Sequence, residues 1–347
     1  NDHIWPAEGR FVSEPFVLDG TRLAMAEMLR TGTTTFSDMY FFPEVTAQVA
    51  HDVGMRAQIC FPLLDNPTVW GSGPEDYLRK GADLIAQWPH APYTMPAIGP
   101  HAPYTVSDQP LTAAVKLAEE TGAALQIHLH ETAFEVDEAV KATGKRPVAR
   151  MAELGVLGPN SQYVHMTQID DSDLEHLARA GGHIVHCPES NLKLASGFCP
   201  VQKLIDSNIN VTIGTDGAAS NNDLDLFREL KPAAMVAKVV AGDAAAVSAH
   251  TALRMATING ARALGRDHEL GSLVPGKLAD LIAVDLSDPF LQPVYDPASH
   301  LVYSNHGRAV SHSWIHGVPQ VQDGRLTRID VPDLMLRVSD WRNKILS

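Results

Sequence analysis

One unit recurs between residue 21 and about residue 265: a helical stretch, a turn, and a short apolar or β-branched run that usually ends in polar residues. Short runs that alternate with helices predict strands that pair in parallel through helical crossovers. The pattern therefore predicts an α/β fold of the (β/α)8 barrel type, in which a closed barrel needs eight strands. Seven such runs occur: Thr33–Met39, Met55–Pro62, Met95–His101, Ala124–Glu131, Tyr163–His165, Gly182–Cys187 and Asn210–Asp216.

The pattern changes from about Leu270 onward. Gly and Asp residues separate three short runs, Leu278–Asp285, Ser313–Ile315 and Val318–Leu326. Such runs are typical of antiparallel strands joined by tight turns. We expect a small β-sandwich domain beside the barrel, followed by a helix whose apolar residues recur at helical spacing. The predicted boundaries are 1–265 for the barrel, 266–329 for the β-domain and 330–347 for the C-terminal helix.

Composition argues against several functional classes. The 347 residues include 27 basic and 41 acidic side chains, which give a formal charge of −14. Binding to phosphate backbones needs a basic surface, so we expect no nucleic-acid partner. No apolar run approaches the roughly 18 residues of a membrane helix, so we expect no membrane partner. The three cysteines form no Cys-x-x-Cys pair, which favours reduced thiols in a cytoplasmic protein: Cys60, Cys187 and Cys199.

Polar side chains gather at the ends of the predicted strands. In (β/α)8 barrels, the residues that perform chemistry lie at the C-terminal ends of the strands. Imidazole and carboxylate groups that converge on one barrel mouth suit a divalent metal such as zinc. The sequence therefore predicts a metal site, with structural histidines as the simpler alternative. The strand-end residues are Asp38, His101, His128, His130, Glu131, His165, His186 and Asp216.

The densest cluster is the segment His128-Leu129-His130-Glu131. Residues two apart in a strand share a face, so His128 and His130 are expected to point the same way. One interpretation is a metal clamp made by these two histidines. The other is a single ligand, His128, with Glu131 as a general acid or base just beyond the strand end. The sequence does not separate the two.

Asp216 closes the last apolar run of the predicted barrel. An unpaired carboxylate at the end of a buried strand costs on the order of several kcal/mol, so a metal ion is its expected partner. The alternative role is to cap the following helix, but Asn221, Asn222 and Asp223 lie nearer to that helix. We therefore expect Asp216 to take part in chemistry.

Together, these residues resemble the amidohydrolase superfamily of metal-dependent barrels. The resemblance rests on His128-x-x-Glu131, on His165 at the end of the next strand, and on Thr215-Asp216-Gly217. Three longer segments resemble the branch of 5-methylthioadenosine/S-adenosylhomocysteine deaminases, which is close to the triazine chlorohydrolases. These segments are Gly99–Thr105, His186–Gly197 and Gly271–Leu281.

The resemblance implies roles for individual residues. His128 and Asp216 would bind one divalent metal ion, most commonly zinc, with iron or manganese as alternatives. The catalytic residues would be Glu131, His165 and Asp216, which act on the water and the substrate. The residues that hold a purine nucleoside would be Glu8, His101, Glu131 and Ser220.

In the family, a first barrel strand with a His-x-His pair supplies two further ligands and precedes the segment that matches Trp5–Glu8. The printed sequence starts at Asn1 and contains seven predicted strands, so we expect this first strand to lie outside it. A gap should then separate the strands at Thr33–Met39 and Asn210–Asp216. His130 would lie behind the metal ligands, and the resemblance assigns no role to His186.

The implied reaction is the metal-dependent, hydrolytic deamination of 5-methylthioadenosine or S-adenosylhomocysteine. A second interpretation keeps the machinery but changes the substrate to adenosine, guanine, another aminated heterocycle or a chlorotriazine. A third is a non-catalytic barrel that binds purines or partner subunits. A homo-oligomer is compatible with all three.

Overall fold

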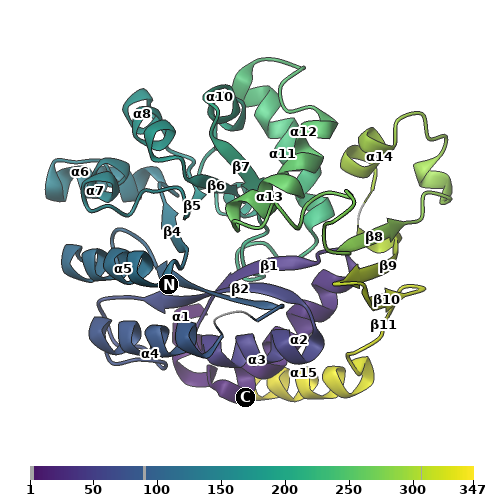
Figure 1. Cartoon of the computed structure of the whole chain (residues 1–347), viewed down its shortest axis with the longest axis horizontal. Helices are drawn as coiled ribbons and strands as arrows, with labels where there is room; N and C mark the ends of the chain where they lie inside the picture. Colours follow the sequence, from purple (N-terminus) through teal and green to yellow (C-terminus); the bar gives the residue numbers. More distant parts are fainter. Residues whose placement is uncertain (1–3, 89–90, 306) are drawn as a thin grey trace.

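The computed structural model describes residues 4–88, 91–305 and 307–347, and its larger part is a curled parallel sheet flanked by helices (Figure 1). The sheet has seven strands in the order β1-β2-β3-β4-β5-β6-β7, so that neighbours along the chain are neighbours in the sheet. Each of the seven predicted runs overlaps one strand, which confirms the parallel α/β fold. The strands are β1 (Thr35–Met39), β2 (Arg56–Leu63), β3 (Thr94–Pro100), β4 (Leu125–Leu129), β5 (Ser161–His165), β6 (His183–His186) and β7 (Asn210–Ile213).

Helices join consecutive strands and begin and end at recognisable residues. Asp170 caps α8 by accepting hydrogen bonds from the backbone N–H groups of Ser172 and Asp173. Gly122 ends α5 with a φ of 72°, a left-handed conformation that glycine adopts without strain. The helices of this part are α1 (Ile4–Phe11), α2 (Glu14–Arg30), α3 (Pro43–Val53), α4 (Pro74–Gln87), α5 (Asp108–Thr121), α6 (Ala133–Thr143), α7 (Pro147–Glu153), α8 (Asp171–Ala180), α9 (Pro188–Lys193), α10 (Val201–Asp206), α11 (Leu226–Ala241), α12 (Ala249–Met255) and α13 (Ile258–Ala263).

The core lies between the sheet and its helices. All residues of β2 are buried, and Ile59 and Phe61 have no exposed surface. Full burial of a side chain of this kind contributes about 1.5–3 kcal/mol. Gly81 of α4 lies so close to Phe61 that a Cβ atom at this position would be 2.2 Å from the ring. The absence of a side chain at Gly81 therefore lets α4 pack directly on β2.

The sheet is open on one side. In the described part of the chain, β1 pairs only with β2, and β7 pairs only with β6. A cavity of about 600 Å³ is lined by residues of both edge strands, among them Thr35, Ser37 and Thr212. The gap expected between these two strands is therefore present.

A separate four-stranded antiparallel sheet lies beside the barrel strands. Its strands are β8 (Leu281–Val284), β9 (Val310–Ile315), β10 (Val318–Gln322) and β11 (Arg325–Leu326), in the order β11-β10-β9-β8. The strands described within residues 266–329 thus form a single sheet. Between β8 and β9 the chain forms α14 (Pro297–Tyr303), which packs against α11 and α12. Asp280, just before β8, forms a buried ion pair with Arg56 of β2, with 3.1 Å between Oδ2 and Nε.

The predicted C-terminal helix is confirmed as α15 (Val331–Leu346), which packs against α2 (Figure 1). The indole of Trp341 meets the ring of Phe16 edge to face, with 5.1 Å between centroids. Its Nε1 donates a hydrogen bond of 2.9 Å to Oδ2 of Asp19. The helix is therefore fixed to the barrel by both apolar and polar contacts.

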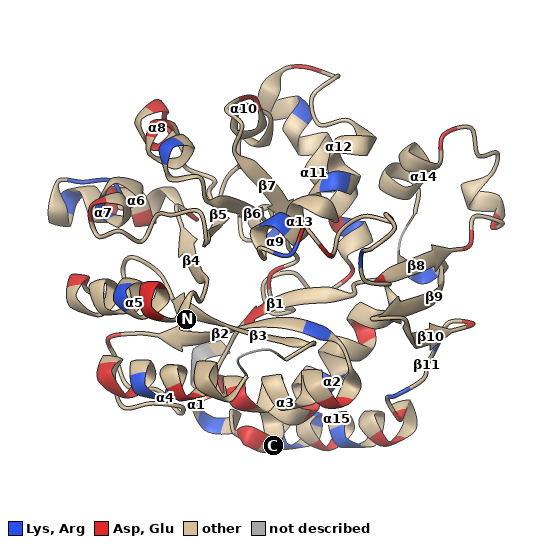
Figure 2. Cartoon of the chain, viewed as in Figure 1, with Lys and Arg blue, Asp and Glu red and all other residues tan. Residues whose placement is uncertain are grey.

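Charged side chains lie mostly on the helices and loops rather than on the strands (Figure 2). In the described ranges, no helix is both long and apolar enough to cross a membrane. Cys60, Cys187 and Cys199 are buried free cysteines, as expected from their spacing.

Candidate functional site

Three histidines lie together at the C-terminal edge of the sheet. His101 follows β3, His128 lies in β4 and His165 ends β5. The ring centroid of His128 is 5.2 Å from that of His101 and 5.6 Å from that of His165. Because the strands run in parallel and in register, residues far apart in the sequence reach the same edge.

The orientation of His128 is set by the neighbouring strand. Its Nδ1 donates a hydrogen bond of 2.6 Å to the backbone oxygen of His101. This contact places the proton on Nδ1 and leaves Nε2 with a free electron pair. Metal-binding histidines are commonly held in this way by a carbonyl on the other ring nitrogen.

Glu131 lies just beyond β4, as predicted, and its carboxylate faces the histidines. Its Oε2 is 3.8 Å from Nε2 of His165, and its Oε1 accepts a long hydrogen bond of 3.5 Å from Ser196. Burial raises the pKa of Glu131, and Asp216 raises it further, whereas His128 lowers it. A carboxyl group with a raised pKa is suited to proton transfer near neutral pH.

The loop that carries Glu131 is held from behind by Glu135 of α6. The Glu135 carboxylate accepts hydrogen bonds from the backbone N–H groups of His130 (3.0 Å) and Glu131 (2.8 Å). Burial raises the pKa of Glu135 to about 7. Glu135 therefore fixes the loop, while the Glu131 carboxylate keeps its long hydrogen bond from Ser196.

His165 is a buried, neutral imidazole with a defined tautomer. The side-chain amide of Asn191 donates a hydrogen bond of 3.0 Å to Nδ1 of His165. The proton of the neutral ring therefore lies on Nε2, on the side of Glu131. Burial, followed by the proximity of His128, lowers the pKa of His165 to about 3.

Asp216 follows β7 and is oriented by two donors. Ser190 Oγ donates to its Oδ2 (2.7 Å), and the backbone N–H of Gly217 donates to its Oδ1 (2.6 Å). The following helix, α11, is capped by Asp225 through a contact with the N–H of Phe227. As expected, Asp216 does not cap this helix. The capping residue is, however, none of the three that the sequence suggested, which were Asn221, Asn222 and Asp223.

Four non-glycine residues at these strand ends have a positive φ. The angles are 53° for His130, 77° for His165, 51° for Met166 and 63° for Asp216. Such conformations cost on the order of 1–3 kcal/mol each and are concentrated at functional sites. Their clustering here marks the same edge of the sheet that the side chains identify.

His130 does not share the face of His128. Strand β4 ends at Leu129, and the left-handed φ of His130 turns its side chain away from the alternating strand pattern. Its Nδ1 donates to the backbone oxygen of Gln168 (3.0 Å), and its Nε2 accepts from the N–H of Val148 (3.1 Å). Both ring nitrogens are thus occupied, and the geometry does not bring His130 to the site.

His186, at the end of β6, is buried, and neither of its ring nitrogens has a hydrogen-bond partner among the described residues. Burial lowers its pKa to about 4, so the ring is neutral. A buried polar group without a partner indicates that a water, ion or substrate group completes the site. Among residues 4–88, 91–305 and 307–347, no three His, Cys, Asp or Glu side chains are placed to hold a metal ion together.

Two of the expected substrate-binding residues, His101 and Glu131, belong to the group at this edge. Nδ1 of His101 is hydrogen-bonded to Thr105 Oγ1 at 2.9 Å. Glu8 of α1 accepts a hydrogen bond of 2.6 Å from the hydroxyl of Tyr40, which directly follows β1. Ser220 is half-buried in the turn after Asp216. The 600 Å³ cavity is lined by Asp38, Tyr40, His128 and Asp216, among others, so it reaches the site.

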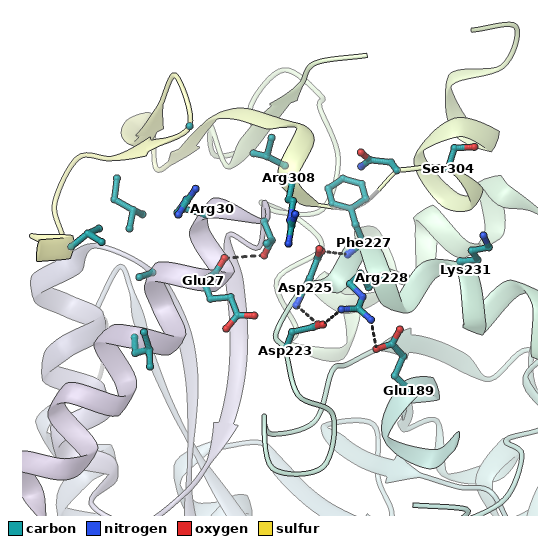
Figure 3. Close-up of a pocket in the computed structure, with 18 of the residues that line it drawn as sticks. Glu27, Arg30, Glu189, Asp223, Asp225, Phe227, Arg228, Lys231, Ser304 and Arg308 are labelled. Atoms are coloured by element: carbon teal, nitrogen blue, oxygen red, sulfur yellow. Dashed lines mark hydrogen bonds and ion pairs between the residues drawn. The ribbon is translucent and has the colours of Figure 1, made fainter. Parts of the chain in front are cut away.

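A second cavity, of about 1120 Å³, lies between α2, α11 and the small sheet and contains none of the strand-end residues (Figure 3). Three of the charged side chains at its wall pair with one another, since Arg228 contacts both Asp223 and Glu189. Asp225 is also occupied, since it caps α11. Of these two cavities, the smaller one is therefore the one that strand-end residues line, namely Asp38, His128 and Asp216.

The sequence did not identify the residues that orient the site. Ser190, Asn191 and Thr105 contact Asp216, His165 and His101 respectively. All three lie in the segments used above for the resemblance, yet no pattern of spacing indicates their contacts. They would be found only by asking which donors can satisfy buried histidine and carboxylate groups.

A family model described as "Amidohydrolase family" matches residues 5–319. A 5-methylthioadenosine/S-adenosylhomocysteine deaminase of Saccharophagus degradans is 54% identical, over 99% of this chain and 77% of the relative. The crystal structure of an adenosine deaminase from Xanthomonas campestris, with bound zinc, is 44% identical with a TM-score of 0.98, over 99% of this chain and 78% of the other. An atrazine chlorohydrolase of Arthrobacter aurescens, complexed with zinc, is 23% identical with a TM-score of 0.90, over 97% and 79% of the two chains; it shows the fold alone.

Proposed function

Because the chain belongs to the amidohydrolase family, we propose that it is a metal-dependent aminohydrolase that acts on 5-methylthioadenosine or S-adenosylhomocysteine. The reaction replaces the 6-amino group of the purine by a 6-oxo group and releases ammonia. The observation that carries the proposal is the gathering of His128, His165, Glu131 and Asp216 at one edge of the sheet.

The imidazole and carboxylate groups at this edge fit a divalent metal ion in type and orientation. His128 Nε2 has a free electron pair, and Asp216 is an oriented carboxylate. The unpartnered nitrogens of His186 support the view that the site is completed by a further group. We propose that His128 and Asp216 are ligands of one zinc ion, with iron or manganese as alternatives; zinc sites commonly have three or four protein ligands. When bound, such an ion supplies the Lewis acidity that makes hydroxide available near neutral pH.

The protein residues would divide the proton transfers. Asp216 accepts a proton from the attacking water. Glu131, whose pKa is raised by burial, donates a proton to the ring nitrogen beside the attacked carbon. It then takes the proton of the hydroxyl formed at that carbon and passes it to the departing ammonia, and the proton that Asp216 accepted returns to Glu131. His165, protonated on Nε2, donates a hydrogen bond that steadies the attacking oxygen.

The nucleoside would be held by residues around the cavity. We propose that Glu8 accepts hydrogen bonds from the ribose hydroxyls, and that His101 and Ser220 contact the remainder of the nucleoside. We also propose that the protein works in a reducing cytoplasm, which would keep the three buried cysteines as thiols. We propose no nucleic-acid or membrane partner, and the proposed function is compatible with a homo-oligomer.

The second candidate keeps this machinery and changes the substrate. The zinc-containing structural neighbour named adenosine deaminase favours adenosine as that substrate. The other substrates in this alternative are guanine, another aminated heterocycle or a chlorotriazine.

The test is a substrate panel with the metal-loaded protein. We expect 5-methylthioadenosine or S-adenosylhomocysteine to release ammonia with the highest kcat/KM, adenosine with a lower value, and free adenine with a poor one. A site built to bind hydroxyls discriminates strongly against analogues that lack them, so 2′,3′-dideoxyadenosine should be worse than adenosine. A best substrate without a ribose would overturn the nucleoside proposal, and release of chloride but not ammonia would overturn the deaminase.

A further inference from the structure

One hydrogen bond connects the first helix to the edge of the barrel sheet. The hydroxyl of Tyr40 donates to Oε1 of Glu8 at 2.6 Å. This hydrogen bond joins a side chain of α1 to the segment that follows β1. Tyr40 lies two residues after Asp38 and lines the cavity that also contacts His128 and Asp216. The contact therefore holds the Glu8 carboxylate against a residue of the cavity wall.

The contact has the geometry of a strong, charge-assisted hydrogen bond. An O–H donor and a carboxylate in such a bond lie about 2.5–2.7 Å apart. Burial, and then the neighbouring carboxylates of Glu8 and Asp38, raise the pKa of Tyr40 well above its usual value. The phenol therefore keeps its proton and remains a donor throughout the working pH range of an enzyme.

The same contact leaves most of the Glu8 carboxylate free to bind. An ionised carboxylate accepts about four hydrogen bonds, of which Tyr40 uses one on Oε1. Two neighbouring hydroxyls of a ribose present two donors at a spacing that one carboxylate can accept. The tyrosine ring has only two rotatable bonds, so it fixes the longer glutamate side chain at low entropic cost.

We propose that Tyr40 is a positioning residue for sugar recognition, which fixes Glu8 in the orientation that binds the ribose diol. This inference rests on the proposed function. It adds the residue that sets the selectivity of the enzyme for ribosides over deoxy analogues. The competing role for Tyr40 is structural: the hydroxyl would only attach α1 to the barrel. The two roles differ in what they predict for substrates with and without the diol.

The experiment compares Tyr40→Phe with the native, metal-loaded protein on adenosine, 5-methylthioadenosine and 2′,3′-dideoxyadenosine. A hydrogen bond to a charged group contributes about tenfold or more to an equilibrium. We expect KM for the two ribosides to rise about tenfold, with kcat changed less than about threefold. For the dideoxy substrate, kcat/KM should stay within about twofold, because the diol is absent. In a Glu8→Gln background, Tyr40→Phe should have little further effect on the ribosides.

Tyr295→Phe is the control, because Tyr295 is 89% exposed and removal of its hydroxyl should change none of these values. Equal losses on ribosides and on the dideoxy substrate in Tyr40→Phe would show a structural role and overturn the proposal. Unchanged kinetics on all three substrates would also overturn it, while the proposed function would stand. If the native protein released ammonia from no nucleoside, the proposed function would fail and this inference with it.

Discussion

Asn191 should control catalysis through the tautomer of His165. Its amide donates to His165 Nδ1 at 3.0 Å, and both residues are almost fully buried, at 2% and 1% exposure. Replacement by leucine, which has a similar size, removes this donor and leaves Nδ1 unpaired. The neutral ring can then carry its proton on either nitrogen, so the Nε2–H group that faces Glu131 is no longer guaranteed.

Two losses follow from the Asn191→Leu substitution, and their sizes differ. A buried acceptor left without a partner costs about 1–3 kcal/mol. Since Oδ1 of Asn191 itself has no partner, leucine also removes one buried unpaired atom, and we expect a loss of stability of about 1–2 kcal/mol. Complete removal of a donor to a developing oxyanion costs about 10²–10³ in kcat. A variant in which the His165 ring keeps the correct tautomer part of the time should lose less, about tenfold in kcat.

The structure offers a matched control at the other end of the same sheet. The side-chain amide of Asn210 contacts Nδ1 of His183 at 3.1 Å, at the first residues of β7 and β6. The same amide also donates to the backbone oxygen of Asn259 at 3.0 Å, so Asn210→Leu should lower stability as well but leave kcat unchanged. Thermal melts, kcat for ammonia release and ¹⁵N NMR of the histidine rings measure stability, activity and tautomer. A native kcat in Asn191→Leu, or an equal loss in Asn210→Leu, would refute the tautomer argument.

Two further substitutions test other parts of the site. His130→Asn should lower the melting temperature because two buried hydrogen bonds are lost. The zinc content, measured by elemental analysis, should not change. Loss of zinc would instead support the interpretation in which His128 and His130 both bind the metal. Glu229 accepts hydrogen bonds from Asn221 and from the backbone of Glu189, and burial raises its pKa to about 8, above its ordinary value of 4.5. This group therefore contributes stability below about pH 4.5 that is lost as the pH rises through 8, so Glu229→Gln should flatten the decline of melting temperature between pH 5 and 8. A decline of unchanged slope in the variant would contradict the assignment.

The sequence predicted the strands and the residues at their ends because both follow from local patterns. Apolar runs between amphipathic stretches identify β1 to β7, and parallel strands bring their C-terminal ends to one edge. Thus His128, His165 and Glu131 lie within reach of one another although they come from different units. The tail from 330 was predicted in the same way, from its helical spacing.

The remaining features depend on backbone turns and long-range contacts that no local pattern encodes. The alternation rule placed His130 beside His128, but β4 ends one residue earlier and the backbone turns at a φ of 53°. Proximity in sequence suggested a cap at 221–223, whereas Asp225 provides it. The contact between Asn191 and His165 joins residues 26 positions apart, and only the fold brings them together.

The central claim is that this edge of the sheet performs hydrolytic deamination with Glu131 as the proton donor. The most direct measurement is ammonia release from 5-methylthioadenosine by the zinc-loaded native protein and by Glu131→Gln, with zinc determined on the same samples. We expect the native protein to form ammonia and the 6-oxo product in equal amounts, and the variant to keep its zinc but lose about 10² or more in kcat. Near-native turnover by a zinc-loaded Glu131→Gln variant would contradict the account.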